Sequence, residues 1–70
     1  MTVIKLAENI RVCRARKRLT QKDLADRAGV AVATIGKLER GIQSEEETEL
    51  RTVIKLATAL DISPNKLVGW

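Results

Sequence analysis

The chain has no histidine, tyrosine or phenylalanine, and its only cysteine and tryptophan are Cys13 and Trp70. One cysteine cannot close a disulfide within the chain, and clusters of histidine and cysteine that hold zinc or haem are excluded. We therefore expect neither a metal nor a cofactor. Trp70 is also the only ring on which the bases of a single-stranded nucleic acid could stack, so we do not expect a binding platform of that class.

Long apolar runs and a signal-peptide pattern are also missing, which indicates a cytoplasmic protein without membrane contact. The chain lacks a catalytic constellation as well, because it has no histidine, no glycine-rich phosphate loop after a strand and no cleft of paired carboxylates. We therefore do not expect an enzyme. A chain of 70 residues buries only about 60% of its unfolded surface, which indicates one small domain over residues 1–70.

The net charge of +4 is unevenly distributed along the chain. Residues 1–20 carry a net charge of +5, whereas residues 42–50 carry −4 from four glutamates. A dense basic cluster is typical of a surface that binds a polyanion, and it is also compatible with an ordinary solvated helix face. Charge alone leaves these two interpretations open.

Apolar residues recur at helical spacing almost throughout, and no segment has the alternation of a strand. The sequence therefore predicts an all-α fold of five short helices, at about 3–17, 21–28, 32–40, 46–60 and a last one opened by Ser63-Pro64. The apolar face of the first helix is formed by Val3, Leu6, Ala7, Ile10 and Cys13. Because Cys13 lies on this face, we expect it to act as a small core residue.

Local residue patterns mark where the helices begin and end. Thr20 and Asp23 have the spacing of a capping box that starts the second helix. Gly29 and Gly41 are expected to end the second and third helices in the left-handed conformation. Gly36 lies in the middle of the third helix, which costs about 1 kcal/mol relative to alanine. Either another group approaches the backbone closely there, or the glycine is simply tolerated.

The segment Leu19–Gly41 contains two short helices joined by a tight glycine turn, and this pattern predicts a helix-turn-helix over about 20–41. The major groove of DNA, about 12 Å wide, admits one helix. In this motif the first helix crosses the DNA backbone and holds the second helix in the groove.

The chain resembles the Cro/C1-type (XRE-like) helix-turn-helix family over about residues 6–68. The residues that carry the resemblance are Ile10-Arg11, Leu19-Thr20-Gln21, Asp23, Leu24-Ala25, Gly29-Val30, Ile35, Leu38-Glu39-Arg40-Gly41, Ile54 to Ser63, and Lys66-Leu67. The resemblance implies a compact, lambda-repressor-like domain of five helices. It also implies a sequence-specific transcriptional regulator of double-stranded DNA, typically a repressor that binds a palindromic operator as a homodimer.

Positions that match the family motif give the expected site. The residues expected at DNA are Thr20, Gln21, Ala31, Val32, Ala33, Thr34, Lys37 and Arg40. Phosphate contacts are expected from Arg14, Arg16, Lys17 and Arg18, and Arg14 and Glu39 match a structural ion pair between the first and third helices. Thr20 is a helix cap in either case, and Lys37 is also compatible with a solvated helix side chain.

Three features depart from the family pattern. Ala31, Val32 and Ala33 are small and apolar, so that only Lys37 is well suited to hydrogen-bond a base, and specificity is expected to depend on thymine methyl groups and DNA shape. The loop after Gly41 carries acidic residues over 45–49, and it either points away from DNA or meets another protein. Arg18 takes a position where glycine often ends the first helix, which implies slight strain if φ is positive there.

Two further interpretations concern partners. Leu67, Val68 and Trp70 at the C-terminal end are expected to form the homodimer interface, although Trp70 could instead fold over the fourth helix. The second candidate function is a protein-interaction module, antitoxin-like or an anti-repressor partner, with weak or no DNA binding. The apolar recognition positions and the acidic loop keep that possibility open.

Overall fold

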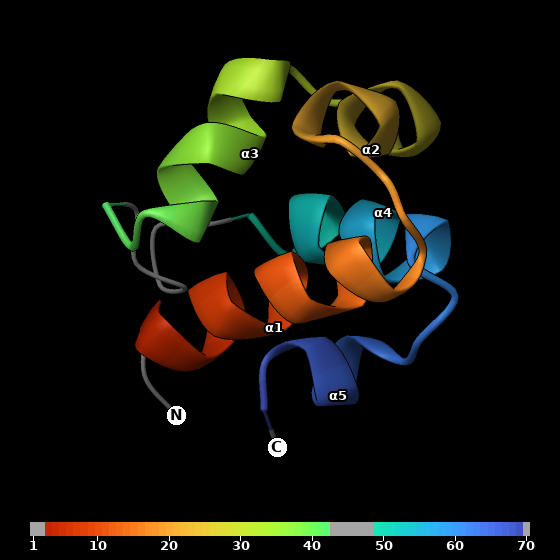
Figure 1. Cartoon of the computed structure of the whole chain (residues 1–70). Helices are drawn as coiled ribbons and strands as arrows, with labels where there is room; N and C mark the ends of the chain where they lie inside the picture. Colours follow the sequence, from red (N-terminus) through yellow and green to blue (C-terminus); the bar gives the residue numbers. More distant parts are fainter. Residues whose placement is uncertain (1–2, 43–48, 70) are drawn as a thin grey trace.

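The computed structural model describes residues 3–42 and 49–69, which form five α-helices. These are α1 (Val3–Arg16), α2 (Gln21–Ala28), α3 (Val32–Glu39), α4 (Leu50–Ala59) and α5 (Pro64–Leu67). No strand occurs in these two ranges, and the all-α prediction is confirmed. The helices α2 and α3 lie together on one side, α1 and α4 form the middle, and α5 lies on the far side with both chain ends (Figure 1).

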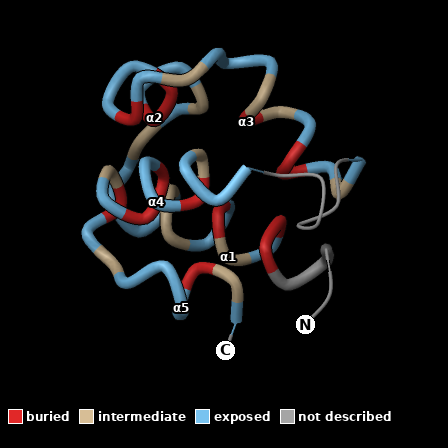
Figure 2. The backbone as a smooth tube through the Cα atoms, turned by 180° about the vertical axis from the view of Figure 1, so that it is seen from behind, coloured by how far each residue is buried: buried red, intermediate tan, exposed pale blue. Residues whose placement is uncertain are grey.

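All five helices contain buried residues (Figure 2). The apolar side chains of these residues form one core. The largest fully buried side chains are Leu6, Ile10, Leu24, Ile35, Leu38, Leu56, Leu60 and Leu67. Their helical spacing is what predicted the helices, because each helix must bury its apolar stripe against the others. Cys13 is half-buried and packs against this core, as expected, while the side chain of Val3 lies outside the described part.

The beginning and end of α2 confirm the local predictions. The Thr20 hydroxyl accepts from the Asp23 amide at 3.0 Å, and the Asp23 carboxylate accepts from the Thr20 amide at 3.0 Å. These hydrogen bonds from Thr20 lower the pKa of Asp23, because they favour the charged carboxylate. Gly29 has φ of +70°, and its amide donates to the Ala25 carbonyl at 2.9 Å. Helix α2 is thus capped at both ends by the residues that flank it directly in the chain.

The fourth helix begins later than predicted. Its N-cap is Glu49, which has extended backbone angles, so α4 starts at Leu50 and not at residue 46. The first buried side chain of α4 is Val53, and packing therefore holds the helix only from that turn onward. The possible cap Ser44 and the glutamates at 45–47 lie outside the described residues.

Within residues 3–42 and 49–69, two residues other than glycine have positive φ angles. Arg18 has φ of +56°, so the condition under which its place in the family pattern implies slight strain is met, and Asp61 has φ of +59° after the end of α4. A left-handed conformation costs a side chain of this kind roughly 1 kcal/mol.

The Asn9 side chain connects α1 to α5, and no sequence pattern indicated this. Its amide donates to the carbonyls of Lys66 at 3.2 Å and Leu67 at 2.9 Å, which are acceptors at the end of α5. This contact fixes a helix of only four residues. Within the residues that the structure describes, no helix has the length and apolar character needed to cross a membrane.

Candidate nucleic-acid interface

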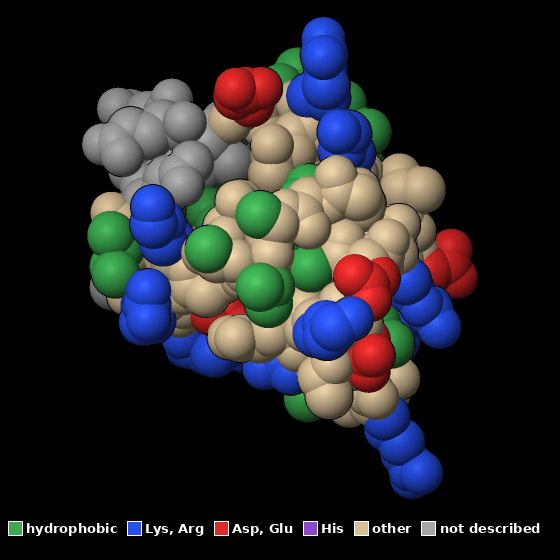
Figure 3. Space-filling model, turned by 90° about the horizontal axis from the view of Figure 1, so that it is seen from above, with side chains coloured by type: hydrophobic (Ala, Val, Ile, Leu, Met, Phe, Trp, Pro, Cys, Tyr) green, Lys and Arg blue, Asp and Glu red, His purple; other side chains and the backbone are tan. Residues whose placement is uncertain are grey.

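Helix α3 presents one face to the core and the opposite face to solvent. Ile35, Leu38 and Glu39 are buried, whereas Ala33 and Lys37 are exposed on the other side. Figure 3 views the molecule from above α2 and α3, and there hydrophobic side chains gather on the surface with Lys and Arg at several points around them. A protruding helix with a small apolar surface and nearby cations has the shape and charge to enter a groove of DNA.

The other predicted positions of the motif also lie at or near this surface. Ala31 and Arg40 are exposed at the two ends of α3, and Thr34 is half-buried. Val32 is 48% exposed although it is a large apolar residue. Apart from the neighbouring residues and the backbone of α3 itself, no described atom lies within 4 Å of where a β-carbon at Gly36 would be, so packing against another described element does not explain this glycine.

The end of α3 is fixed by the predicted ion pair. Arg14 donates through Nε to Glu39 Oε2 at 2.8 Å and through Nη2 to Glu39 Oε1 at 3.1 Å. Its third bond, from Nη1, goes to the Leu19 carbonyl at 2.8 Å. The Glu39 side chain is only 5% exposed, and its carboxylate raises the pKa of Arg14 by accepting these hydrogen bonds. The pair therefore connects three parts of the chain, namely α1, the turn that precedes α2, and also α3.

Two more side chains donate hydrogen bonds to Glu39. Arg11 donates to the backbone carbonyl of Glu39, and Gln21 Nε2 donates to Glu39 Oε1 at 3.3 Å. Gln21, which the motif places at DNA, thus also contacts the third helix. The role of Arg11 was not predicted, although Arg11 and Arg14 are three residues apart and therefore lie on neighbouring parts of the same helix face.

The beginning of α2 offers backbone donors close to α3. The capping box satisfies the amides of Thr20 and Asp23, and it does not use those of Gln21 and Lys22. Free amides in the first turn of a helix, together with the positive end of its dipole, are suited to a phosphate oxygen. This helix end can therefore accept an anionic group while α3 occupies the neighbouring space.

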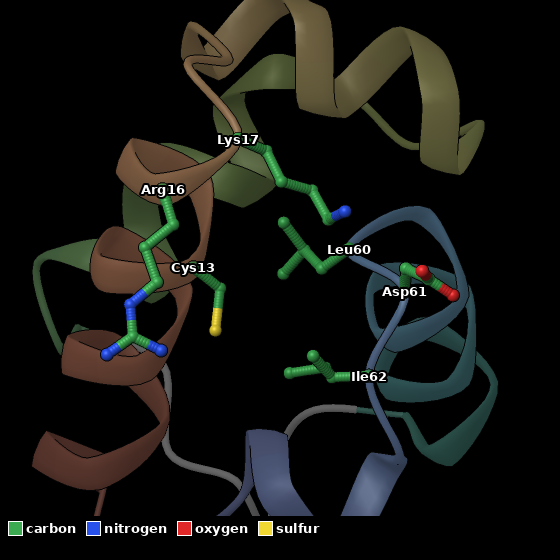
Figure 4. A pocket seen from close by; sticks show the side chains of 6 residues that line it. All are labelled: Cys13, Arg16, Lys17, Leu60, Asp61 and Ile62. Atoms are coloured by element: carbon green, nitrogen blue, oxygen red, sulfur yellow. The ribbon is translucent and has the colours of Figure 1, made fainter.

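Arg16 and Lys17 lie elsewhere. They line a shallow pocket with Cys13 and with Leu60, Asp61 and Ile62 of the connection between α4 and α5 (Figure 4). Arg14 faces α3 from the other flank of α1. Arg16 and Lys17 thus line this pocket and not the side of α1 on which Arg14 meets α3, and their phosphate contacts stay a prediction. The sequence showed that these residues are positively charged, but it did not show that Arg14 lies on a different side of α1 from Arg16 and Lys17.

Helix α3 has no side-chain cap, because its N-cap is Ala31. We predict that Ala31→Ser raises the free energy of unfolding by about 1 kcal/mol, since a serine hydroxyl can accept a first-turn amide. Urea unfolding followed by circular dichroism measures this. The control is Ala15→Ser at an exposed position within α1, which is expected to lower stability slightly because serine is the poorer helix former. Equal changes in both variants would contradict the capping argument.

Leu67 is fully buried in the core of its own chain, so its side chain is not available to a second copy. Val68 is half-buried against the same core, and Trp70 lies outside the described residues. The C-terminal dimer interface expected from the sequence thus loses its central apolar anchor. Among the described residues, no group of three His, Cys, Asp or Glu side chains is placed to hold a metal ion.

Comparison with known proteins gives similar chains of related architecture. The uncharacterized HTH-type transcriptional regulator YqaE of Bacillus subtilis (strain 168) is 32% identical over 62 residues, which cover 89% of this chain and 51% of the relative. This chain therefore spans about half the length of that curated relative.

Two solved structures share the fold over nearly all of the chain. The restriction-modification controller protein C.AhdI from Aeromonas hydrophila has a TM-score of 0.84 and 37% identity, over 93% of this chain and 94% of that one. The master regulator for biofilm formation SinR, solved in complex with DNA, has a TM-score of 0.83 and 27% identity, over 90% and 97% of the two chains.

The helix-turn-helix family model matches residues 10–67, which include α2, the glycine turn, α3 and the core helices around them. The geometry agrees with this match, because α3 is exposed and is held by the Arg14–Glu39 pair as the motif of this family implies. The chain belongs to the Cro/C1-type helix-turn-helix family.

Proposed function

We propose that this protein binds double-stranded DNA by inserting α3 into the major groove and that it regulates transcription in this way. The observation that carries the proposal is the exposed face of α3, whose last residue is held by side chains from α1 and α2. The similarity to SinR, solved in complex with DNA, supports it. We propose, in particular, a cytoplasmic repressor that binds a palindromic DNA site.

The residues of α3 have different parts in this proposal. Lys37 is exposed and can donate to a base edge such as guanine, whereas Val32 and Ala33 can contact thymine methyl groups. With so few polar groups, direct readout is narrow, and sequence-dependent DNA shape supplies the remaining specificity. The expected DNA contacts of Ala31 and Thr34 complete this face.

Phosphates are proposed to bind around this face. The amides of Gln21 and Lys22, which the capping box does not use, donate to the oxygens of one phosphate at the N-terminus of α2, with the Thr20 hydroxyl beside them. Arg40 at the end of α3 and Arg18 in the turn before α2 are exposed and supply further cations. Arg14 keeps its structural contact with Glu39 in this arrangement.

A titration of DNA affinity against salt tests the proposal. The dissociation constant is measured by fluorescence anisotropy on sites selected from random duplex DNA. The logarithm of the binding constant is expected to fall linearly with the logarithm of salt concentration, with a slope of about −0.9 for each phosphate neutralised. Affinity that does not change with salt, or no selected site at all, would contradict the proposal and favour a protein partner.

Lys37→Ala is expected to relax specificity at one base position by about 1–3 kcal/mol, because Lys37 is the only long polar donor proposed at base edges. The measurement is relative affinity across a library of single-base variants of the selected site. Arg40→Ala is the matched control, since loss of a phosphate contact should weaken all sites equally. If both variants change the library in the same uniform way, Lys37 does not read a base.

A further inference from the structure

The shallow pocket between the end of α1 and the α4–α5 connection contains no residue of α3, and the proposed DNA contacts leave it unused. Its volume is about 300 Å³, at the lower end of the range of about 300–1,000 Å³ that holds small molecules. Cys13 on one wall and Leu60 and Ile62 on the other point towards one another across it (Figure 4). Leu60 is fully buried, so the pocket reaches down to the core. These facing apolar groups are suited to cover a short hydrocarbon chain.

Two cations line the same pocket from the end of α1. Arg16 and Lys17 are exposed, and Lys17 extends towards Leu60 (Figure 4). Neither cation belongs to an ion pair among residues 6–42 and 49–69. The acidic side chain of the lining is Asp61, and its carboxylate points away from the centre of the pocket (Figure 4). With two cations and one carboxylate, the lining has a net charge of +1 and can hold one negative charge.

We propose that this pocket binds a small aliphatic monocarboxylate. The hydrocarbon chain lies between Cys13, Leu60 and Ile62, and the carboxylate accepts hydrogen bonds from Arg16 and Lys17 at the rim. Guanidinium and carboxylate groups match in planar geometry, which makes arginine well suited to this anion. A phosphate monoester is less suited, because its charge of about −1.5 to −2 exceeds that of the lining. Binding in this pocket requires no DNA.

A series of straight-chain probes tests the two parts of the ligand separately. Isothermal titration calorimetry gives the affinities of acetate, butanoate and hexanoate for the full chain. Each further methylene is expected to raise the affinity by up to about fourfold, which corresponds to about 0.8 kcal/mol for a buried methylene. Hexan-1-ol lacks the charge and hexylammonium has the opposite charge, so both should bind at least about tenfold more weakly than hexanoate. No binding of hexanoate, an affinity independent of chain length, or equal binding of hexan-1-ol would overturn the proposal.

Arg16→Gln combined with Lys17→Gln should weaken hexanoate binding by about tenfold or more, because the carboxylate loses both charged donors. Arg51→Gln combined with Lys55→Gln is the matched control, since it removes two exposed cations of α4 that do not line the pocket. Thermal unfolding without ligand shows that both variants keep the fold. An equal loss of affinity in the two variants would mean that hexanoate responds only to net charge, and no loss in the first would contradict the site.

Cys13 reports where the probe binds, because it is the only thiol of the chain and lines the pocket. The rate at which iodoacetamide, a neutral reagent, alkylates Cys13 is followed by mass spectrometry as the hexanoate concentration rises. This rate is expected to fall to about half at the dissociation constant that calorimetry gives, since bound hexanoate covers the thiol. An unchanged rate with hexanoate bound would place the ligand elsewhere and overturn the proposal. Because none of these measurements uses DNA, a failure of DNA binding is separately visible.

Discussion

Ala33→Glu is expected to lower DNA affinity by about 100-fold or more while the fold stays intact. Ala33 is exposed in the first turn of α3, on the proposed DNA face, so the new carboxylate would lie against the phosphates and base edges of the groove. Like charges brought together at an interface cost several kcal/mol, and each 1.4 kcal/mol is tenfold in affinity. The measurement is the dissociation constant for the selected duplex at one fixed salt concentration.

The matched control for this prediction is Asn65→Glu. Asn65 is the second residue of α5, as Ala33 is of α3, and both variants make the net charge one unit more negative. Helix α5 lies on the opposite side of the molecule from α3 (Figure 1). Only a small loss, from the change in net charge, is expected in the control. Equal losses in the two variants would show that DNA does not meet α3.

Arg14→Met is expected to lower the free energy of unfolding by about 3–5 kcal/mol. The substitution keeps much of the side-chain volume but leaves the Glu39 carboxylate buried without its cation, and removal of one partner of a buried pair has this effect. Globular domains have only about 0.05–0.15 kcal/mol of stability per residue. A chain of 70 residues therefore loses a large part of its total stability, which urea unfolding followed by circular dichroism measures.

Two further variants separate the charge of Arg14 from its geometry. Arg14→Lys keeps the cation but not the two parallel hydrogen bonds to Glu39, so an intermediate loss is expected. The double variant Arg14→Met with Glu39→Leu removes both charges and should recover much of the stability. A loss below about 1 kcal/mol in Arg14→Met would mean that the pair acts like an exposed surface contact.

Most of the secondary structure could be predicted because it depends on neighbours in the chain. The capping box of Thr20 and Asp23, the left-handed Gly29 and the helical periodicity of the apolar residues are local features. The structure confirms the first two, and it confirms the apolar stripes except at Leu50 and Ile54 of α4, which are exposed. The start of α4 was predicted four residues too early. Glutamates over 45–49 are compatible with the first turn of a helix by local rules, but a helix this short needs packing, which begins only at Val53.

The candidate site, too, could be predicted from the sequence only in part. The family motif indicated the exposed positions of α3 and the pair of Arg14 and Glu39, and the geometry agrees with these assignments. It did not indicate that Arg11 holds the end of α3 or that Arg16 and Lys17 turn towards the α4–α5 connection. Residues one turn apart on α1 look alike in sequence, and their neighbours depend on how the helix is rotated in the packed domain.

By itself, the sequence determined the helices, their caps, the family and the uneven distribution of charge, because each of these follows from residue type and spacing along the chain. Only the tertiary structure decided which side chains are covered. It buried Leu67 and left Leu50 and Ile54 in solvent, although all three are apolar residues at helical spacing. Burial depends on the direction in which each helix meets the others, and that direction is a property of the whole packed core.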